Sequence, residues 1–234
     1  MTARARVVLA TRNPGKAREI SAIYGHLDAE FVTLGAWPEL GELPEHGATY
    51  AENAVSKARA AAAATGCVAL ADDSGIEIDA LDGAPGPRSR RFLGDDASDA
   101  DRNAHVLALL REVPEAGRTA RYRAAVAVAL PDGAVHVVEG TCEGRVARAP
   151  HGGGGFGYDP VFVATADGRT MAELSLDEKN RISHRARALR AAEPHLRAAL
   201  ATRGKEPRPL DANTTTGPRR AGRSTDDPRV GGRP

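Results

Sequence analysis

Two long strands joined by a tight turn restrict the possible folds of this chain more than any other feature. Thr119 to Leu130 and Ala134 to Val146 both have strand character, and Pro131-Asp132-Gly133 between them is a turn signal. The two strands of a hairpin pair antiparallel to each other, whereas the strand-helix-strand units elsewhere in the chain produce parallel pairs. We therefore expect an α/β protein with a long mixed sheet flanked by helices.

The strand-helix units have clear boundary signals. Arg6 to Thr11 is a short apolar run, and it is followed by Asn13, which caps helices well, and by Pro14, which is favoured at the first helical position. A long Ala-rich helix is predicted over Thr49 to Thr65, where Thr49 and Glu52 have capping-box spacing. Because capping accounts for Glu52, we do not count it among the metal candidates. Further elements are predicted as strands at Glu30 to Leu34 and Val161 to Val163, and as helices at Ser98 to Val113, from Ser175 to a break near Ile182, and from Ser183 to about Thr202.

Two adjacent carboxylates follow a short buried strand. Val68 to Ala71 is apolar, Asp72-Asp73-Ser74-Gly75 has the composition of a turn, and Ile76 to Leu81 alternates apolar and acidic residues as an exposed edge strand would. Neighbouring aspartates in a turn repel each other, but they suit a hard cation such as Mg²⁺, which takes one or two carboxylates from protein. An Asx turn is the structural alternative for one of the two.

The length of 234 residues suits one domain of about 200 residues with a tail. We place the domain at residues 1–203 and a Pro-, Gly- and Arg-rich disordered tail at 204–234. The tail contains seven Lys or Arg and four Asp or Glu, which leaves the domain with 25 basic and 27 acidic residues. A net negative domain is poorly suited to binding the nucleic-acid backbone, so we expect no nucleic-acid partner.

The chain also has few signs of a secreted or membrane protein. Cys67 and Cys142 are too few for a disulfide framework and lack zinc-site spacing. Met1 to Leu9 has no signal-peptide apolar stretch, and no run approaches 18 apolar residues. We expect a cytoplasmic protein that does not engage a membrane.

Lysine is rare, and its positions are informative. Only four of the 32 basic residues are lysines, and Lys16, Lys57 and Lys179 lie in short polar motifs. Lys16 ends the run Asn13-Pro14-Gly15-Lys16 at a predicted helix start, where backbone N–H groups and the helix dipole favour a phosphate. Glu45 lies in a loop that has no evident structural need for a carboxylate, and is therefore a metal candidate.

A glycine-rich loop, His151 to Gly155, precedes two of the nine aromatic residues. Phe156-Gly157-Tyr158-Asp159 offers a ring on which a base can stack, although core aromatics at a loop end are the alternative. Ser183-His184-Arg185 adds donors at a helix start, one turn after Lys179.

These motifs together resemble the Ham1 family of inosine/xanthosine triphosphate pyrophosphatases, in order from about Val7 to Leu200. The resemblance implies a two-lobed α/β homodimer with a cleft between the lobes. It implies hydrolysis of ITP, dITP and XTP to the monophosphate and pyrophosphate with Mg²⁺. Asp73 would be proton acceptor and metal ligand, and Glu45 the second ligand. The substrate-binding residues would be Thr11, Arg12, Asn13, Pro14, Gly15, Lys16, Lys57, Ser74, Phe156, Gly157, Tyr158, Asp159, Lys179, His184 and Arg185.

Two other classes of function fit part of the pattern. A regulatory module that only binds nucleotides would keep the phosphate cradle, but gains nothing from two carboxylates without a metal. A phosphatase with an aspartyl nucleophile usually spaces two aspartates by one residue, whereas Asp72 and Asp73 are adjacent. We therefore favour the metal-dependent hydrolase.

Overall fold

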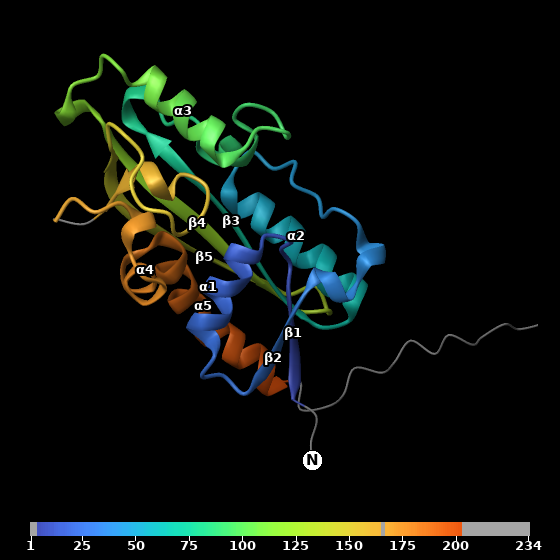
Figure 1. Ribbon diagram of the computed structural model, residues 1–234. Helices are drawn as coiled ribbons and strands as arrows, with labels where there is room; N and C mark the ends of the chain where they lie inside the picture. The colour runs from blue at the N-terminus through green and yellow to red at the C-terminus, as the bar shows by residue number, and fades with distance from the viewer. Residues whose placement is uncertain (1–3, 165–166, 203–234) are drawn as a thin grey trace, which may run out of the picture.

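The computed structural model describes residues 4–164 and 167–202, which form one mixed six-stranded sheet with helices on both faces (Figure 1). The tail predicted at 204–234 lies outside the described residues. The strands are β1 (Ala5–Leu9), β2 (Ala29–Thr33), β3 (Val68–Ile78), β4 (Thr119–Ala129), β5 (Val135–Val146) and β6 (Phe162–Val163). The α-helices are α1 (Pro14–Tyr24), α2 (Tyr50–Thr65), α3 (Asp99–Leu109), α4 (Leu176–Ile182) and α5 (His184–Thr202).

The sheet has the strand order β2-β1-β3-β4-β5-β6. β1 pairs in parallel with β2 and β3, and the remaining pairs are antiparallel. The predicted hairpin is β4 and β5, which pair from Thr119 opposite Arg145 to Ala129 opposite Val135. The α/β class and the mixed sheet expected from the sequence are thus confirmed.

Strand alternation sends the core side chains to two faces. Leu70 and Val126 pack with α1 and α5 on one face, and Ala69 and Ala127 pack with α2 on the other. A third cluster surrounds the far ends of β3, β4 and β5, where Ile78 and Tyr122 pack near α3. Figure 1 shows α3 at that end of the sheet, away from β1 and β2. The strands therefore join two parts of the molecule.

The helix boundaries follow the predicted signals. Asn13 caps α1, and its side-chain oxygen accepts from the N–H groups of Gly15 and Lys16. Thr49 and Glu52 form the expected capping box on α2. α4 ends at Ile182 and α5 begins at His184, which confirms the break expected there.

The region after Ala71 differs from the prediction. β3 continues without a turn through Asp72 and Asp73 to Ile78. Ile76 and Ile78 pair with β4 and are fully buried, and their N–H groups donate to Ser89 Oγ and to the Ala84 carbonyl oxygen on the other side of the strand. The predicted turn and the predicted exposed edge at Ile76 to Leu81 are both wrong. Asp and Gly are depleted in strands, but eleven residues of β3 are held by pairing with β1 and β4. An exposed strand edge would be a reason to expect a dimer, because a second copy could pair with it. Since Ile76 and Ile78 are buried, β3 gives no such reason.

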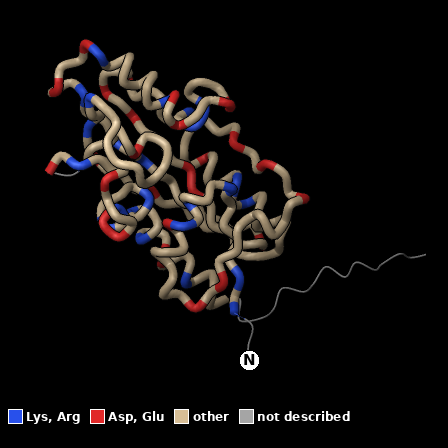
Figure 2. Tube along the Cα trace, in the orientation of Figure 1, with Lys and Arg blue, Asp and Glu red and all other residues tan. Residues whose placement is uncertain are grey.

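No helix among the described residues is both long and apolar enough to cross a membrane. Figure 2 shows acidic and basic residues interspersed along the trace.

Gly140 in β5 provides a test of how closely α5 is packed on the sheet. A Cβ atom at Gly140 would lie 2.3 Å from the His184 carbonyl oxygen and 2.5 Å from the Ala188 nitrogen. Gly140→Ala should lower the free energy of unfolding in urea by about 1–3 kcal/mol, because backbone atoms of α5 must move away. Gly153→Ala is the control, since a Cβ there meets no heavy atom within 4 Å. Equal losses in both variants would contradict this account.

Candidate active site

The two adjacent aspartates point to opposite faces of the sheet. Because side chains alternate along β3, Asp72 faces α1 and α5 while Asp73 faces α2. Both are buried, with exposed fractions of 1% and 9%. They therefore do not form one carboxylate pair in a turn, and each has its own charged partners.

Asp72 belongs to a buried network of cations and carboxylates. Its Oδ2 atom lies 3.1 Å from Lys16 Nζ and 2.9 Å from Arg185 Nε. These cations hold the pKa of the Asp72 carboxyl well below its usual range although burial alone would raise it. Asp72 is thus an ionised structural anchor, and because β3 continues through it, it does not form the Asx turn considered for one of the two aspartates.

Arg185 connects this network to α1 and to Ser74. Its Nη1 donates to Glu19 Oε2 at 2.6 Å, and its Nη2 donates to Ser74 Oγ at 2.7 Å. Glu19 also lies 2.8 Å from Lys179 Nζ, and Lys179 in turn pairs with Asp159. Three cations and three carboxylates therefore form one continuous buried network across α1, β3, α4 and α5.

Glu19 is the member that the sequence analysis missed. It is 3% exposed, and it lies one turn after Lys16 in α1, next to buried Ile20. Its helical position beside the apolar face was a usable signal, because a carboxylate there must be paired when the helix packs.

Asp73 has a different set of partners on the α2 face. Lys57 Nζ donates to Asp73 Oδ1 at 3.2 Å and to the Asp72 carbonyl oxygen at 2.9 Å. Asn53 Nδ2 donates to Asp73 Oδ2 at 3.1 Å. Burial outweighs these contacts and raises the pKa of the Asp73 carboxyl. The environments of the two aspartates thus push their pKa values apart, and Asp73 is the better proton acceptor.

Glu45 joins Asp73 at the same lysine. Its Oε1 atom lies 2.5 Å from Lys57 Nζ, and its Oε2 accepts from Arg91 at 3.0 Å. The loop carboxylate is therefore paired rather than free. The structure nevertheless brings Glu45 and Asp73 to one ammonium group, as expected for two carboxylates that could share a cation.

The described residues contain no group of three or more His, Cys, Asp or Glu that could hold a metal ion. A two-carboxylate set suits Mg²⁺, which keeps several waters and takes its other ligands from phosphates. Asp73 and Glu45, already converged on a cation, fit that requirement.

The phosphate-cradle residues lie at the start of α1. Lys16 is paired only with Asp72 among the described residues, and its side chain is 16% exposed. The N–H groups of Gly15 and Lys16 donate to the Asn13 side-chain oxygen. The sequence suggested that these donors were available to a phosphate, but in the structure they are already used. Thr11 Oγ1 accepts from the Asn13 N–H, and Arg12 donates to the Gly41 carbonyl oxygen at 2.6 Å.

The Phe156 ring lies directly over this helix start. A Cβ at Gly15 would be 2.5 Å from Phe156 Cδ1, so only glycine lets the ring approach. Lys179 Nζ is 4.8 Å and the Arg185 guanidinium 5.3 Å from the ring centroid. Residues of three motifs that are far apart in sequence therefore meet at one half-buried aromatic ring.

Two side chains of α3 form hydrogen bonds with the backbone of Gly157, the residue after Phe156. Asp99 Oδ2 accepts from the Gly157 N–H at 2.7 Å, and Asn103 Nδ2 donates to the Gly157 carbonyl oxygen at 3.0 Å. The sequence analysis missed both contacts, because α3 is distant in sequence from this loop.

Tyr158 and Asp159 are buried rather than presented to a ligand. Tyr158 donates to the Ser89 carbonyl oxygen, and Asp159 accepts from the Phe156 N–H at 2.9 Å. The core alternative considered for the loop aromatics applies to Tyr158.

His184 is buried at the start of α5. Its ring stacks on Tyr122 with centroids 4.5 Å apart, and its Nδ1 has no hydrogen-bond partner among the described residues. Burial and neighbouring cations hold the pKa of His184 well below its usual range. His184 is thus a neutral imidazole with an unused polar atom.

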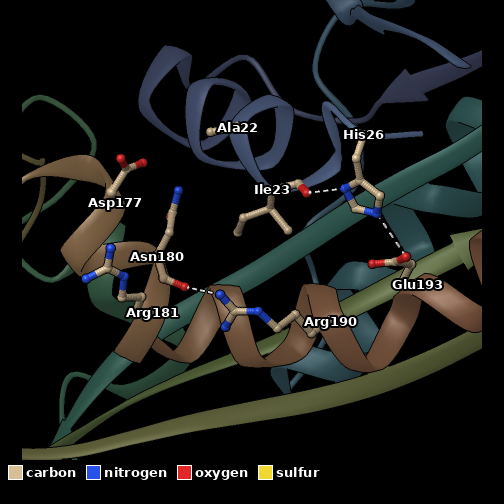
Figure 3. Close-up of a pocket in the computed structure, with 8 residues that line it drawn as sticks. All are labelled: Ala22, Ile23, His26, Asp177, Asn180, Arg181, Arg190 and Glu193. Carbon is tan, nitrogen blue, oxygen red and sulfur yellow. Dashed lines mark hydrogen bonds and ion pairs between the residues drawn. The ribbon is translucent and has the colours of Figure 1, made fainter. Parts of the chain in front are cut away.

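A pocket of about 390 Å³ between α1, α4 and α5 contains none of the candidate residues (Figure 3). Its polar groups pair with each other: His26 lies 3.0 Å from Glu193, and Arg190 donates to the Asn180 carbonyl oxygen. Its two arginines are balanced by Asp177 and Glu193. This lining gives no reason to place the active site there.

Comparisons with known proteins agree with the resemblance seen in the sequence. The profile of the Ham1 family matches residues 7–195. The chain belongs to the Ham1 family. It is 52% identical over 195 residues to a dITP/XTP pyrophosphatase of Symbiobacterium thermophilum, covering 83% of this chain and 96% of that protein. The corresponding protein of Desulforamulus reducens is 48% identical over 187 residues, covering 80% and 93%.

Solved structures of the same family share the fold. A HAM1 protein from Coxiella burnetii superposes with a TM-score of 0.74 at 39% identity, covering 83% of this chain and 99% of that one. A nucleoside-triphosphatase, or dITP/XTP pyrophosphatase, of Mycobacterium abscessus gives a TM-score of 0.65 at 43% identity, covering 81% and 99%.

Replacing Asp72 tests its role as an anchor. Because the pKa of Asp72 is lowered on folding, its ionisation stabilises the fold at every pH above its unfolded value of 3.8 and loses this effect as the pH falls toward the folded pKa. Asp72→Asn should lower the free energy of unfolding at pH 7 by about 3 kcal/mol, since Arg185 and Lys16 lose a buried partner. Urea unfolding measures the change. Asp95→Asn, in an exposed pair with Arg91, is the control, and an equally small effect in both variants would contradict the anchor role.

Proposed function

We propose that this chain is a Ham1-family pyrophosphatase that hydrolyses the non-canonical purine nucleoside triphosphates ITP, dITP and XTP. Water attacks the α phosphorus, and the bond from that phosphorus to the oxygen that bridges it to the β phosphorus breaks. The products are the nucleoside monophosphate and pyrophosphate. The observation that carries the proposal is the different setting of two adjacent carboxylates, with Asp73 held on the α2 face by Asn53 and Lys57 and beside Glu45. The similar proteins of Symbiobacterium thermophilum and Desulforamulus reducens are dITP/XTP pyrophosphatases, which supports the same reaction class.

Asp73 is the group that takes the proton from water. The raised pKa makes its carboxylate a stronger base than an ordinary aspartate. Asn53 fixes the Oδ2 atom by donating to it, which leaves the carboxylate in one orientation. Lys57 and Arg91 together balance the charges of Asp73 and Glu45.

Mg²⁺ held by Asp73 and Glu45 would neutralise charge on the phosphate oxygens and bring the substrate to Asp73. The ammonium of Lys16 is the most accessible cation of the Asp72 network, at 16% side-chain exposure against 2–5% for Arg185 and Lys179. We therefore assign Lys16 to the phosphates.

The base would lie against Phe156. Three N–H groups of Arg185 are used by Asp72, Glu19 and Ser74, and a guanidinium has five. The remaining donors and the neutral His184 ring are suited to the C6 keto group of hypoxanthine or xanthine. The amino group of adenine would present donors to donors, and an unpaired buried donor is costly.

We also propose that the protein is a homodimer, as the family resemblance implies, that it is cytoplasmic and that it acts on free nucleotides.

Product analysis separates this function from its rivals. The purified protein should convert ITP with Mg²⁺ to IMP and pyrophosphate, measured by anion-exchange chromatography and an orthophosphate assay. Orthophosphate as the first product would indicate the aspartyl phosphatase instead. Binding of ITP without any product would indicate a regulatory module.

Asp73→Asn tests the proton acceptor. The substitution keeps the shape and a hydrogen-bonding oxygen but removes the basicity, so kcat for ITP should fall by at least about 100-fold. The fold should persist, because a carboxyl with a raised pKa destabilises the folded state when ionised, and its replacement removes that cost. Steady-state kinetics and urea unfolding measure the two effects.

The matched control for Asp73→Asn is Asp72→Asn. It should reduce stability more and kcat less. If Asp72→Asn proved the more damaging to kcat at equal folded fraction, the assignment of the proton acceptor would be wrong by one residue.

A further inference from the structure

Arg118, just before β4, is a buried cation that donates to backbone carbonyl groups. It is 1% exposed. Its guanidinium donates to the carbonyl oxygens of Val146, Leu110 and Ala147 at 2.9, 2.6 and 2.7 Å. No Asp or Glu among the described residues forms an ion pair with it, in contrast to Arg185. Within residues 4–164 and 167–202, carbonyl dipoles therefore provide the hydrogen bonds to a charge whose burial is costly.

The Arg118 side chain lines a pocket of about 530 Å³ at the end of the sheet that α3 covers. The lining consists of Ala104, Leu107, Ala108, Arg111, Arg118 and Arg148. Three of these six side chains are cationic and none is acidic, whereas the pocket of Figure 3 has balanced charges. The volume lies in the range of small-molecule sites.

The charges around this pocket are only partly compensated. Glu115 lies 3.4 Å from Arg148 Nε, but it also pairs with Arg145 at 2.5 Å, and its side chain is half exposed. The Arg111 side chain has no ion-pair or hydrogen-bond partner within the part of the chain that the structure describes. An incoming anion would thus meet three arginines and one shared carboxylate.

We propose that this pocket is a binding site for a small free phosphate anion, inorganic phosphate or pyrophosphate. Guanidinium groups match the oxygen spacing of phosphate and bind it with charge-assisted hydrogen bonds. Ala104 and Ala108 leave room for a compact ligand between α3 and Arg148. An anion there would also offset the buried charge of Arg118, whose pKa is lowered by burial.

The site is separate from the candidate active site. Ala125 is the β4 residue opposite Asp73, and it lies seven positions along the chain from Arg118. At about 3.3 Å per residue the two sites lie on the order of 20 Å apart along β4. The inference does not depend on the proposed hydrolysis.

The test must distinguish this pocket from the active site, which would also bind pyrophosphate. We would follow the Nε–H signal of Arg118 by NMR while adding inorganic phosphate, pyrophosphate or, at matched ionic strength, potassium chloride. The Arg118 signal should shift and saturate with pyrophosphate and with phosphate, but not with chloride. No saturable shift with either phosphate anion, or an equal shift with chloride, would overturn the proposal.

Substitution of the two exposed arginines of the pocket, Arg111 and Arg148, completes the test. Arg118→Ala would disrupt three backbone contacts, so the variant to use is Arg111→Ala with Arg148→Ala, both of which alter exposed side chains. Binding at the Arg118 signal should weaken at least about tenfold, because two charge-assisted contacts are lost. Arg59→Ala, an exposed arginine of α2, is the matched control and should leave the affinity unchanged. Equal affinity in the double variant and the wild type would also overturn the proposal.

Discussion

The alternation of side chains along β3 is the constraint on which the candidate site depends. It separates Asp72 and Asp73, although they are neighbours in sequence, and gives them opposite electrostatic settings. Asp72 receives two cations and its pKa falls; Asp73 is buried with weaker compensation and its pKa rises. One strand thereby supplies an ionised anchor and the proposed proton acceptor without placing two carboxylates against each other.

The charged network around Asp72 also determines the positions of α1, α4 and α5. Burying six charges is costly unless each is paired, and here every carboxylate of the network has at least one cation within 3.1 Å. Since Glu19 lies on α1, Lys179 on α4 and Arg185 on α5, a shift of any of these helices would leave a charge unpaired. The network therefore specifies how the helices sit on β3, and this position brings Phe156 over the start of α1.

Local signals predicted much of this fold, while long-range contacts limited the prediction of the site. The hairpin, the capping box of Thr49 and Glu52 and the break before α5 depend on neighbouring residues, and all were predicted correctly. The continuity of β3 was not, because its Asp and Gly residues are held in the strand by pairing with β4, which is distant in sequence. The roles of Glu19 and Asp99 also escaped prediction, because their partners lie 58 or more residues away in sequence.

Charge balance adds a physical reason for a metal that does not rest on the family resemblance. The Asp72 network contains Lys16, Arg185 and Lys179 with Asp72, Glu19 and Asp159, so its formal charges cancel. On the other face, Lys57 and Arg91 balance Asp73 and Glu45. The proposed triphosphate substrate would bring several negative charges to a site that is already neutral, and Asp73, as the proposed proton acceptor, would have to stay ionised. A divalent cation that arrived with the phosphates would meet both needs at once, because it would offset their charge and pair with the two carboxylates.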